Sequence, residues 1–342
     1  MSAPVRILRD APLAGRNSFG VAATAPLLAE VDDPAALPQL LSRPEFARPM
    51  VLGGGSNLLL AGDPDRPLLA LTGQRVEVLG EDGPVTMVRA QAGANWHRFV
   101  LHSLDLGLCG LENLALIPGT VGAAPIQNIG AYGVEAGEFV HAVHAWEPAR
   151  GRWHRLDRAA CAFGYRDSLF KHEPDRLVIT AVDFALPRQA APRLGYAGLG
   201  EALAAAGIGH PTALDVARAV IGIRQRKLPD PAVLGNAGSF FKNPVIPAAR
   251  AQALLDAHPG LPCFGSGTAR KLSAAWLIDA CGWKGHRDGD AGVSPDHALV
   301  LVNRGGASGA QLLALARRIA DSVRARFGVD LEPEPRLVGA RW

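Results

Sequence analysis

Apolar residues in the first half of the chain recur in short runs that glycines separate, a pattern typical of β-strands. The runs cover residues 49–52, 57–60, 67–71, 76–79, 85–92, 140–146 and 177–186. One helix is expected among them, because Asn95 is a capping residue, apolar side chains follow it at helical spacing, and Gly107 ends the segment.

From about residue 200 the pattern predicts helices mixed with strands. Thr212 and Asp215 form a capping box, which begins a helix that runs towards Lys227. Ser308 and Gln311 form a second box before the longest apolar stripe. Further helices are expected over 247–257 and 272–281, a buried strand over 297–303, and a closing strand over 331–338. The predicted class is α+β, and a segment rich in Pro, Ala and Gln at 187–192 is the best candidate for a domain boundary.

Composition narrows the range of functions. The chain has 342 residues, of which 48% are hydrophobic and 20% charged, so it can bury a sizeable core in two or three lobes. A formal charge of +3 is weak for a nucleic-acid binder. Four cysteines without a CxxC pair indicate reduced thiols in a cytosolic protein, with no disulfide frame and no metal site. The sequence shows no targeting signal, no membrane span and no obligate protein partner.

The first candidate for chemistry is Gly53-Gly-Gly-Ser-Asn57 between two apolar runs. Successive glycines let backbone N–H groups approach a diphosphate closely. The alternative is a tight hairpin in which the glycines supply positive φ.

The second candidate is the loop from Gly110 to Gly133, which from Asn113 onwards carries no formal charge and contains Pro118 and Pro125. Such a loop can pack on a flat apolar ligand while its amides bind the polar edges. An irregular core loop is the alternative, although loops of this length without a function are uncommon.

Three further residues stand in distinctive motifs. Arg166 lies in Gly164-Tyr-Arg-Asp-Ser168, where its cation suits a substrate carboxylate or enolate, unless it only pairs with Asp167. Ser239 is expected in a turn between Gly238 and two phenylalanines, with its hydroxyl facing a dry cavity. Glu334 lies in a proline-stiffened strand, where glutamates are usually solvated.

Together and in this order, the motifs resemble those of the UDP-N-acetylenolpyruvoylglucosamine reductases (UDP-N-acetylmuramate dehydrogenases), in their longer form. The resemblance runs over nearly the whole chain, through NSFG at 17–20, GGGSN, PGTVGAAPIQNIGAYG, GYRDSLFK, RQRKLPDP, GNAGSFFKNP and LEPEPR. It implies a vanillyl-alcohol-oxidase/PCMH-type FAD-binding fold of two lobes, with a C-terminal α+β substrate-binding domain. By that likeness residues 1–72 and 73–192 are the two lobes, with the FAD-binding region at about 16–189. Residues 205–328 are the substrate domain, and 329–342 are the strand that carries Glu334.

The resemblance also implies an activity, in which NADPH reduces enolpyruvyl-UDP-GlcNAc to UDP-N-acetylmuramate through non-covalent FAD, for peptidoglycan synthesis. Arg166, Ser239 and Glu334 match the family's catalytic positions. Tyr132, Tyr196, Lys227 and Asn243 match the positions that hold the UDP-sugar. The FAD-binding positions are Gly53, Gly54, Gly55, Ser56, Asn57, Pro118, Gly119, Thr120, Gly122, Ala123, Asn128, Gly130 and Ala131.

Two departures from the family pattern are visible. The longer form carries a tyrosine on a mobile loop, whereas residues 259–270 here offer only the ring of Phe264. Asp296 and His297 stand where related chains often have amides. Two other functions stay open at this point: another FAD-dependent oxidase or dehydrogenase of the same fold, and a sugar-nucleotide-binding regulator without turnover.

Overall fold

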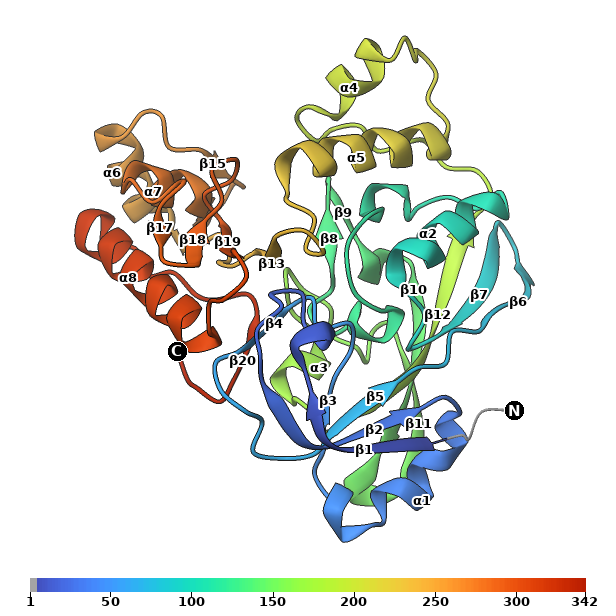
Figure 1. The fold of residues 1–342 in the computed structure, drawn as a ribbon. Helices are drawn as coiled ribbons and strands as arrows, with labels where there is room; N and C mark the ends of the chain where they lie inside the picture. Colours follow the sequence, from blue (N-terminus) through green and yellow to red (C-terminus); the bar gives the residue numbers. More distant parts are fainter. Residues whose placement is uncertain (1–4) are drawn as a thin grey trace. The chain divides into compact units, whose positions relative to one another are not determined.

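The computed structural model describes residues 5–342, which divide into two compact units (Figure 1). Unit 1 is built from residues 5–11, 25–54 and 66–226, and unit 2 from 12–24, 55–65 and 227–342. The chain passes from unit 1 to unit 2 between Gly54 and Gly55, inside the first glycine motif. The segment 187–192 lies within unit 1, and the domain bounds expected from the sequence stay a prediction.

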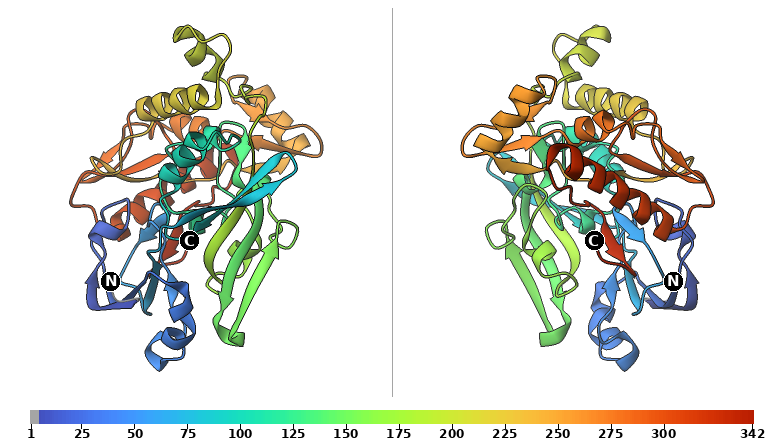
Figure 2. Two further views of the ribbon diagram at one scale, coloured as in Figure 1. Left: turned by 90° about the vertical axis from the view of Figure 1, so that its right-hand side faces the viewer. Right: turned by 90° about the vertical axis from the view of Figure 1, so that its left-hand side faces the viewer.

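Unit 1 contains a five-stranded antiparallel sheet in the order β11-β10-β12-β7-β6. Its long strands run side by side in both views of Figure 2, where most of the sheet is green. The strands are β6 (Val76–Asp82), β7 (Val85–Gln91), β10 (Val140–Glu147), β11 (Arg152–Asp157) and β12 (Val178–Pro187).

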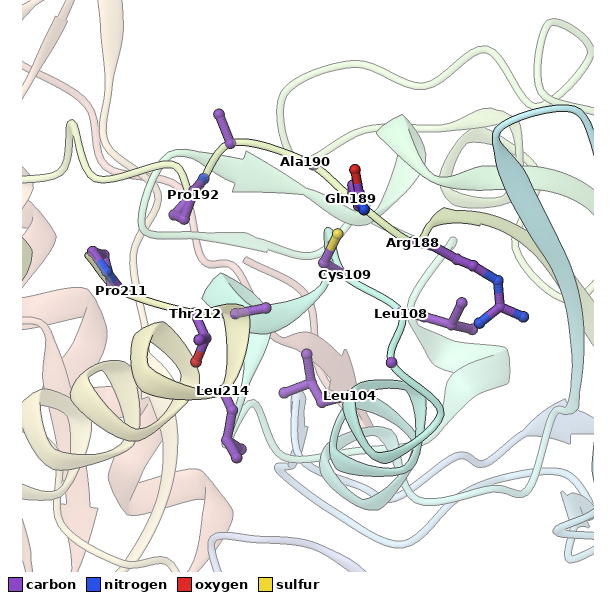
Figure 3. A pocket seen from close by; sticks show the side chains of 13 residues that line it. Leu104, Leu108, Cys109, Arg188, Gln189, Ala190, Pro192, Pro211, Thr212 and Leu214 are labelled. Atoms are coloured by element: carbon purple, nitrogen blue, oxygen red, sulfur yellow. The ribbon is translucent and has the colours of Figure 1, made fainter.

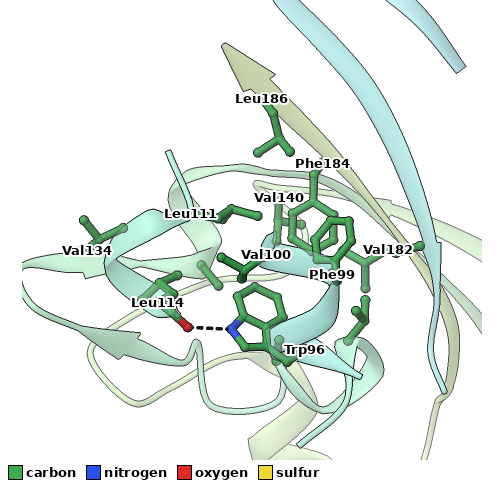
Figure 4. Packing of buried hydrophobic residues seen from close by; sticks show 14 of the residues in the cluster. Trp96, Phe99, Val100, Leu111, Leu114, Val134, Val140, Val182, Phe184 and Leu186 are labelled. Atoms are coloured by element: carbon green, nitrogen blue, oxygen red, sulfur yellow. Dashed lines mark hydrogen bonds between the residues drawn. The ribbon is translucent and has the colours of Figure 1, made fainter. Parts of the chain in front are cut away.

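One face of this sheet packs on helix α2 (Trp96–Asp105), and aromatic rings fill the space between them (Figure 4). The rings of Phe99 and Phe184 lie 4.8 Å apart, centroid to centroid. The indole N–H of Trp96 donates to the Leu114 carbonyl at 3.0 Å, so the buried ring leaves no unsatisfied donor. Asn95 caps α2 by accepting from the Arg98 N–H, as its position in the sequence predicts.

A second sheet of unit 1 has the order β1-β2-β5-β3 and packs with α1 (Leu37–Leu41) around a smaller core. Its strands are β1 (Val5–Pro12), β2 (Thr24–Val31), β3 (Met50–Val51) and β5 (Leu68–Leu71). The remaining elements of the first 227 residues are α3 (Leu169–His172), α4 (Leu199–Ala205), α5 (Ala213–Lys227), β8 (Gly130–Ala131) and β9 (Val134–Glu135).

The strands on either side of the first glycine motif do not pair with each other. β3 pairs with β5, while β4 (Leu58–Leu60) pairs in parallel with β20 (Arg336–Val338). The hairpin alternative for residues 53–57 is therefore wrong, and these glycines serve something other than a two-stranded turn.

Unit 2 contains the sheet β13-β19-β18-β17 and a three-stranded sheet β14-β16-β15. Helix α8 (Gly309–Phe327) packs on β18 and β19, and the capping box of Ser308 and Gln311 begins it as predicted. The other elements are α6 (Ala248–Ala257), α7 (Ala274–Ala280), β13 (Gly235–Ser239), β14 (Val245–Pro247), β15 (Cys263–Phe264), β16 (Ala269–Leu272), β17 (Arg287–Asp288), β18 (Ala291–Val293) and β19 (Val300–Asn303).

Two strands are shorter than the sequence pattern predicts. The closing strand covers only Arg336–Val338 instead of 331–338, because prolines 333 and 335 supply no N–H groups to a ladder. The buried strand begins at Val300 instead of His297. Within the described residues, no helix combines the length and the hydrophobicity that crossing a bilayer requires.

Candidate active site

Two glycine loops of unit 1 lie against each other. A Cβ atom on Gly54 would come within 3.0 Å of the Gly119 Cα, and one on Gly53 within 3.2 Å of the Thr120 Oγ1. Glycine lets the two loops approach this closely, because any larger side chain at either position would press on the neighbouring loop. Among residues 5–342, no group accepts a hydrogen bond from the backbone N–H groups of Gly53, Gly54 and Gly119, which leaves several donors for one anion.

Backbone N–H groups without a protein acceptor in two adjacent glycine loops fit FAD, since such groups can bind a diphosphate. The residues beside them maintain the shape of the second loop. The N–H of Gly122 donates to the Ala92 carbonyl at 2.9 Å, and that of Ala123 to the Thr120 carbonyl at 3.0 Å. Pro118 and Ser56 flank the donors in sequence.

Asn128 connects two turns with its buried side chain. Its amide N–H groups donate to the Glu135 carboxylate at 2.8 Å and to the Gly164 carbonyl at 3.0 Å. Its amide oxygen accepts from the Gly137 N–H at 2.8 Å. The Asn128 side chain thus bonds within the protein, and the expected role of Asn128 in FAD binding stays a prediction.

Gly130–Ala131 and Val134–Glu135 form a short hairpin whose tip is Tyr132-Gly133. Both tip residues have positive φ, as a type I′ turn requires. The turn projects the Tyr132 ring against that of Tyr196, with centroids 4.8 Å apart. The structure thus brings together two residues that the sequence assigns to the UDP-sugar.

Arg224 of helix α5 joins this tyrosine pair and was not predicted from the sequence. Its guanidinium interacts electrostatically with Tyr132, and burial lowers the pKa of that guanidinium. Among the described residues, no group accepts a hydrogen bond from its buried Nε–H, so this donor is not satisfied within the protein. Burial likewise raises the pKa of Tyr132. The signals for Arg224 in the sequence are that it begins the motif RQRKLPDP and stands three residues before Lys227 in one helix.

Arg166 lies in a tight turn closed by reciprocal backbone bonds between Gly164 and Asp167, of 3.0 and 3.2 Å. Its φ of 53° falls in the left-handed region, which costs a non-glycine residue about 1–2 kcal/mol. Its Nη2 donates to the Gly130 carbonyl at 2.6 Å, which directs the guanidinium to the hairpin of Tyr132. Asp167 pairs with His172 at 2.8 Å. Strain of this kind persists where the surroundings hold it, and it is common at functional sites.

Ser239 is the last residue of strand β13. The turn that the sequence predicted at this position is therefore wrong. The strand pairs with β19, and a bulge at Gly238, with φ of 69°, shifts the register before Ser239. The buried rings of Phe240 and Phe241 follow, so the half-buried hydroxyl lies beside an apolar wall. The local glycine pattern predicted a turn because it contains no information on β19, the distant strand that pairs with β13.

Glu334 lies next to Ser239 because two strands of unit 2 fix its backbone. The Glu334 N–H donates to the Phe240 carbonyl at 2.8 Å, and Pro333 forms a bridge with Phe241. The Asn57 amide donates to the Glu334 carbonyl at 3.3 Å. Asn57, expected to bind FAD, thus also holds the segment that carries Glu334.

The other substrate candidates of unit 2 are Lys227 and Asn243. The Asn243 side-chain oxygen accepts the Ala274 N–H at 2.9 Å, which leaves its NH₂ group to donate to a ligand. Burial lowers the pKa of His297, and the charges of Lys227 and Lys284 lower it further. His297 Nδ1 accepts from the Leu299 N–H at 3.2 Å, so the neutral ring carries its proton on Nε2, as a donor.

One hollow of unit 1 lies away from these residues. It has a volume of about 600 Å³ and lies between the end of α2, residues 188–192 and the start of α5 (Figure 3). Leu104, Cys109, Pro192 and Leu214 contribute to its wall, and none of the residues predicted for the site lines it. We therefore do not assign the reaction to it.

Two domain families match the chain. The FAD binding domain matches residues 45–157, and the C-terminal domain of UDP-N-acetylenolpyruvoylglucosamine reductase matches residues 230–338. The first contains both glycine loops, and the second contains Ser239 and Glu334.

Whole-chain relatives agree with these matches. UDP-N-acetylenolpyruvoylglucosamine reductase from Xanthomonas oryzae pv. oryzae is 58% identical over 341 residues, covering 98% of this chain and 97% of the relative. The protein of that name from Xanthomonas campestris pv. campestris is 54% identical over 350 residues, covering 100% and 99%. The crystal structure of UDP-N-acetylenolpyruvylglucosamine reductase from Thermus caldophilus superimposes with a TM-score of 0.68 at 27% identity, covering 98% of each chain. The expected FAD-binding fold of the PCMH type is confirmed. The chain belongs to the UDP-N-acetylenolpyruvoylglucosamine reductase family.

Proposed function

We propose that Arg166, Ser239 and Glu334 carry out the reduction that this chain catalyses. In that reaction enolpyruvyl-UDP-GlcNAc becomes UDP-N-acetylmuramate for peptidoglycan synthesis, with NADPH as the reductant and FAD as the bound cofactor. When bound, FAD accepts hydride from NADPH and supplies it to the β-carbon of the enolpyruvyl group. The protein must then stabilise negative charge on the substrate and deliver one proton.

Arg166 and Glu334 are the groups proposed to stabilise the enolate. Charge accumulates at the α-carbon and on the substrate carboxylate, and preorganised donors directed at developing charge lower the barrier strongly. The guanidinium is planar and can bond two oxygens of a carboxylate. A protonated Glu334 can add a further hydrogen bond to the enolate.

Ser239 is the proposed proton donor. An enolate is a strong enough base to take a proton from a hydroxyl that is held in position. The observation that carries this proposal is the 2.8 Å bond from Glu334 to the carbonyl of Phe240, the residue that follows Ser239. That bond places the acid and the hydroxyl in one rigid part of unit 2.

Ligand binding divides between the remaining residues. We propose that the glycine loops of Gly53–Asn57 and Pro118–Ala123, with the backbone at Asn128–Ala131, hold FAD. Tyr132 and Tyr196 are proposed to contact the UDP-sugar, and Lys227 and Asn243 to supply donors for it. We further propose that the chain works in the cytoplasm without an obligate protein partner. Its four cysteines are all unpaired, which suits a reducing compartment.

Isotope labelling tests this function directly. Purified protein should be yellow and should oxidise NADPH faster when enolpyruvyl-UDP-GlcNAc is added. In D₂O with unlabelled NADPH, deuterium should appear at the α-carbon of the product, because the proton donor exchanges with solvent. A colourless chain that cannot be reconstituted with FAD, or one that binds the UDP-sugar without turnover, would disprove the proposal.

A further inference from the structure

We propose that Lys171 is a positioning residue, which holds Arg166 in its strained backbone conformation and thereby sets the place of the guanidinium. This inference rests on the function proposed for Arg166. The main observation behind this inference is that Lys171 Nζ donates a hydrogen bond to the Arg166 carbonyl oxygen at 2.5 Å. A charged donor makes the stronger kind of hydrogen bond, and this one is partly buried.

The direction of this bond argues against simple helix capping. Lys171 lies in α3, a one-turn helix that begins at Leu169, so its ammonium could satisfy the helix's own last carbonyls. It reaches back five residues instead, to a carbonyl outside the helix. The helix is itself anchored, because the buried Ser168 hydroxyl donates to the Ile126 carbonyl at 2.6 Å. Lys171 therefore extends from a fixed base to the turn.

Backbone and side chain of Arg166 are coupled through φ. If φ relaxed from 53° to the ordinary negative region, the carbonyl oxygen and the Cβ direction would rotate together. The bond from Lys171 stabilises the conformation in which Arg166 Nη2 meets the Gly130 carbonyl at 2.6 Å. Arg166 is thus held at both ends, by Lys171 at its backbone and by Gly130 at its guanidinium.

The same turn offers a matched control. His172, one residue further on, pairs with Asp167 at 2.8 Å, but both side chains are well exposed to solvent. Exposed pairs of this kind contribute little. Lys171 and His172 therefore hold the same turn from neighbouring positions, and only Lys171 bonds to Arg166 itself.

The experiment is a double-mutant cycle in the FAD-loaded, full-length protein. The variants are Lys171→Met, Lys171→Arg, His172→Gln, Arg166→Ala and the double Lys171→Met/Arg166→Ala. For each, stopped-flow absorbance gives the rate of flavin reduction by NADPH and, separately, of reoxidation by enolpyruvyl-UDP-GlcNAc. Flavin content and melting temperature report folding.

We expect Lys171→Met to slow reoxidation by about 10–100-fold, the cost of misplacing a reacting group by about 1 Å. Reduction by NADPH, flavin content and melting temperature should stay near wild type. Lys171→Arg should recover most of the rate, His172→Gln should match wild type, and the double variant should be no slower than Arg166→Ala.

Three results would overturn the inference. Losses that multiply in the double variant would show that Lys171 acts independently of Arg166. Equal slowing of both half-reactions, or loss of flavin and stability, would make Lys171 a residue of the general fold. A fully active Arg166→Ala would disprove the catalytic role of Arg166 as well, and so separates failure of the proposed function from failure of this inference.

Discussion

The backbone N–H of Glu334 donates to the carbonyl of Phe240 at 2.8 Å, although 94 positions separate the two residues in sequence. Backbone bonds of Lys242 with Glu332 and of Arg336 with Asn57 continue the contact on either side. The glutamate is therefore held by main-chain geometry on both flanks. The position of Glu334 beside the end of strand β13 is therefore set by backbone bonds, so single substitutions at Glu334 and Ser239 should test their proposed chemistry more than folding.

Substitution Ser239→Ala should separate the two half-reactions. The change removes one oxygen atom and leaves strand β13, the glycine loops and the NADPH reaction undisturbed. Flavin reduction by NADPH should stay near normal, while turnover of the enolpyruvyl substrate should fall by at least ~10²–10⁴-fold, the contribution of a positioned general acid. Stopped-flow absorbance of the flavin measures both steps.

Ser239→Cys provides the control, because a thiol is more acidic than a hydroxyl and can still donate a proton. It should restore part of the rate lost in Ser239→Ala. If the alanine variant slows both half-reactions equally, or neither, then Ser239 is a packing or binding residue and another group supplies the proton.

Arg166→Lys should be poorly tolerated although the charge is kept. One guanidinium N–H already bonds to Gly130, and the planar fork presents further donors that an ammonium cannot place in the same way. Losing one charge-assisted hydrogen bond of about 1.5–3 kcal/mol corresponds to a loss of about 10–100-fold in substrate-dependent reoxidation. Near wild-type reoxidation in the lysine variant would assign Arg166 a structural role in its turn.

FAD should be bound without a covalent link. No His or Cys lies in residues 53–57 or 118–133, the loops proposed to surround the cofactor. Denaturation followed by gel filtration should therefore release all of the flavin from the chain. Yellow colour or fluorescence that stays with the unfolded polypeptide would contradict the prediction.

Elements that depend on neighbouring residues were predictable from the sequence. The caps at Asn95, Thr212 and Ser308 each act within three or four residues, and all three helices begin there. Contacts between distant segments were not predictable in this way. The glycines of β13 predict a turn, but this segment is a strand because it pairs with β19, which lies about 60 positions later in the chain.

The site residues also divide into those that motif resemblance identified and those that only the fold shows. Motif resemblance identified Tyr132 and Tyr196, and the fold brings their rings together. It missed Arg224 and Lys171, because their roles arise from single contacts across the fold, with Tyr132 and with the Arg166 carbonyl. It assigned Asn128 and Asn57 to FAD, which stays a prediction, and the structure adds that the side chains of both also bond to other parts of the protein.

Gly54→Ala should weaken FAD binding. The new Cβ would lie 3.0 Å from the Gly119 Cα, a backbone atom, so the two loops must move apart by a few tenths of an ångström and their N–H groups must move with them. Fluorescence titration of the flavin-free protein should show affinity at least about 10-fold lower, comparable to the loss of one charge-assisted hydrogen bond to a diphosphate. Gly200→Ala is the control, because no atom lies within 4 Å of its added Cβ and alanine favours helix α4. Equal affinity of the two variants would refute the assignment of these loops to FAD.

Asp183 provides a test of stability that is independent of the reaction. Its side chain is only 3% exposed, and it accepts from Arg89 at 2.6 and 2.9 Å and contacts His144 at 2.8 Å. Burial alone would raise the pKa of this carboxyl, but the hydrogen bonds from Arg89 and His144 hold it below its usual value. A carboxyl with a depressed pKa in the folded state stabilises the fold above its unfolded pKa of about 3.9, and this contribution disappears as the pH falls.

Asp183→Asn should therefore lower the free energy of unfolding near pH 7 by about 1.5–3 kcal/mol, the value of hydrogen bonds to a charged group. The asparagine keeps the shape of the side chain but has no charge to lose, so the difference from wild type should shrink as the pH falls from about 5 towards 3. Melting temperatures with FAD in excess, recorded across this range, measure the effect. Asp105→Asn makes the same chemical change at an exposed residue of α2 and should differ little from wild type at any pH. If the deficit of Asp183→Asn stays constant down to pH 3, the charge of Asp183 does not stabilise the sheet, and the loss reflects the shape or hydrogen-bonding pattern of the amide.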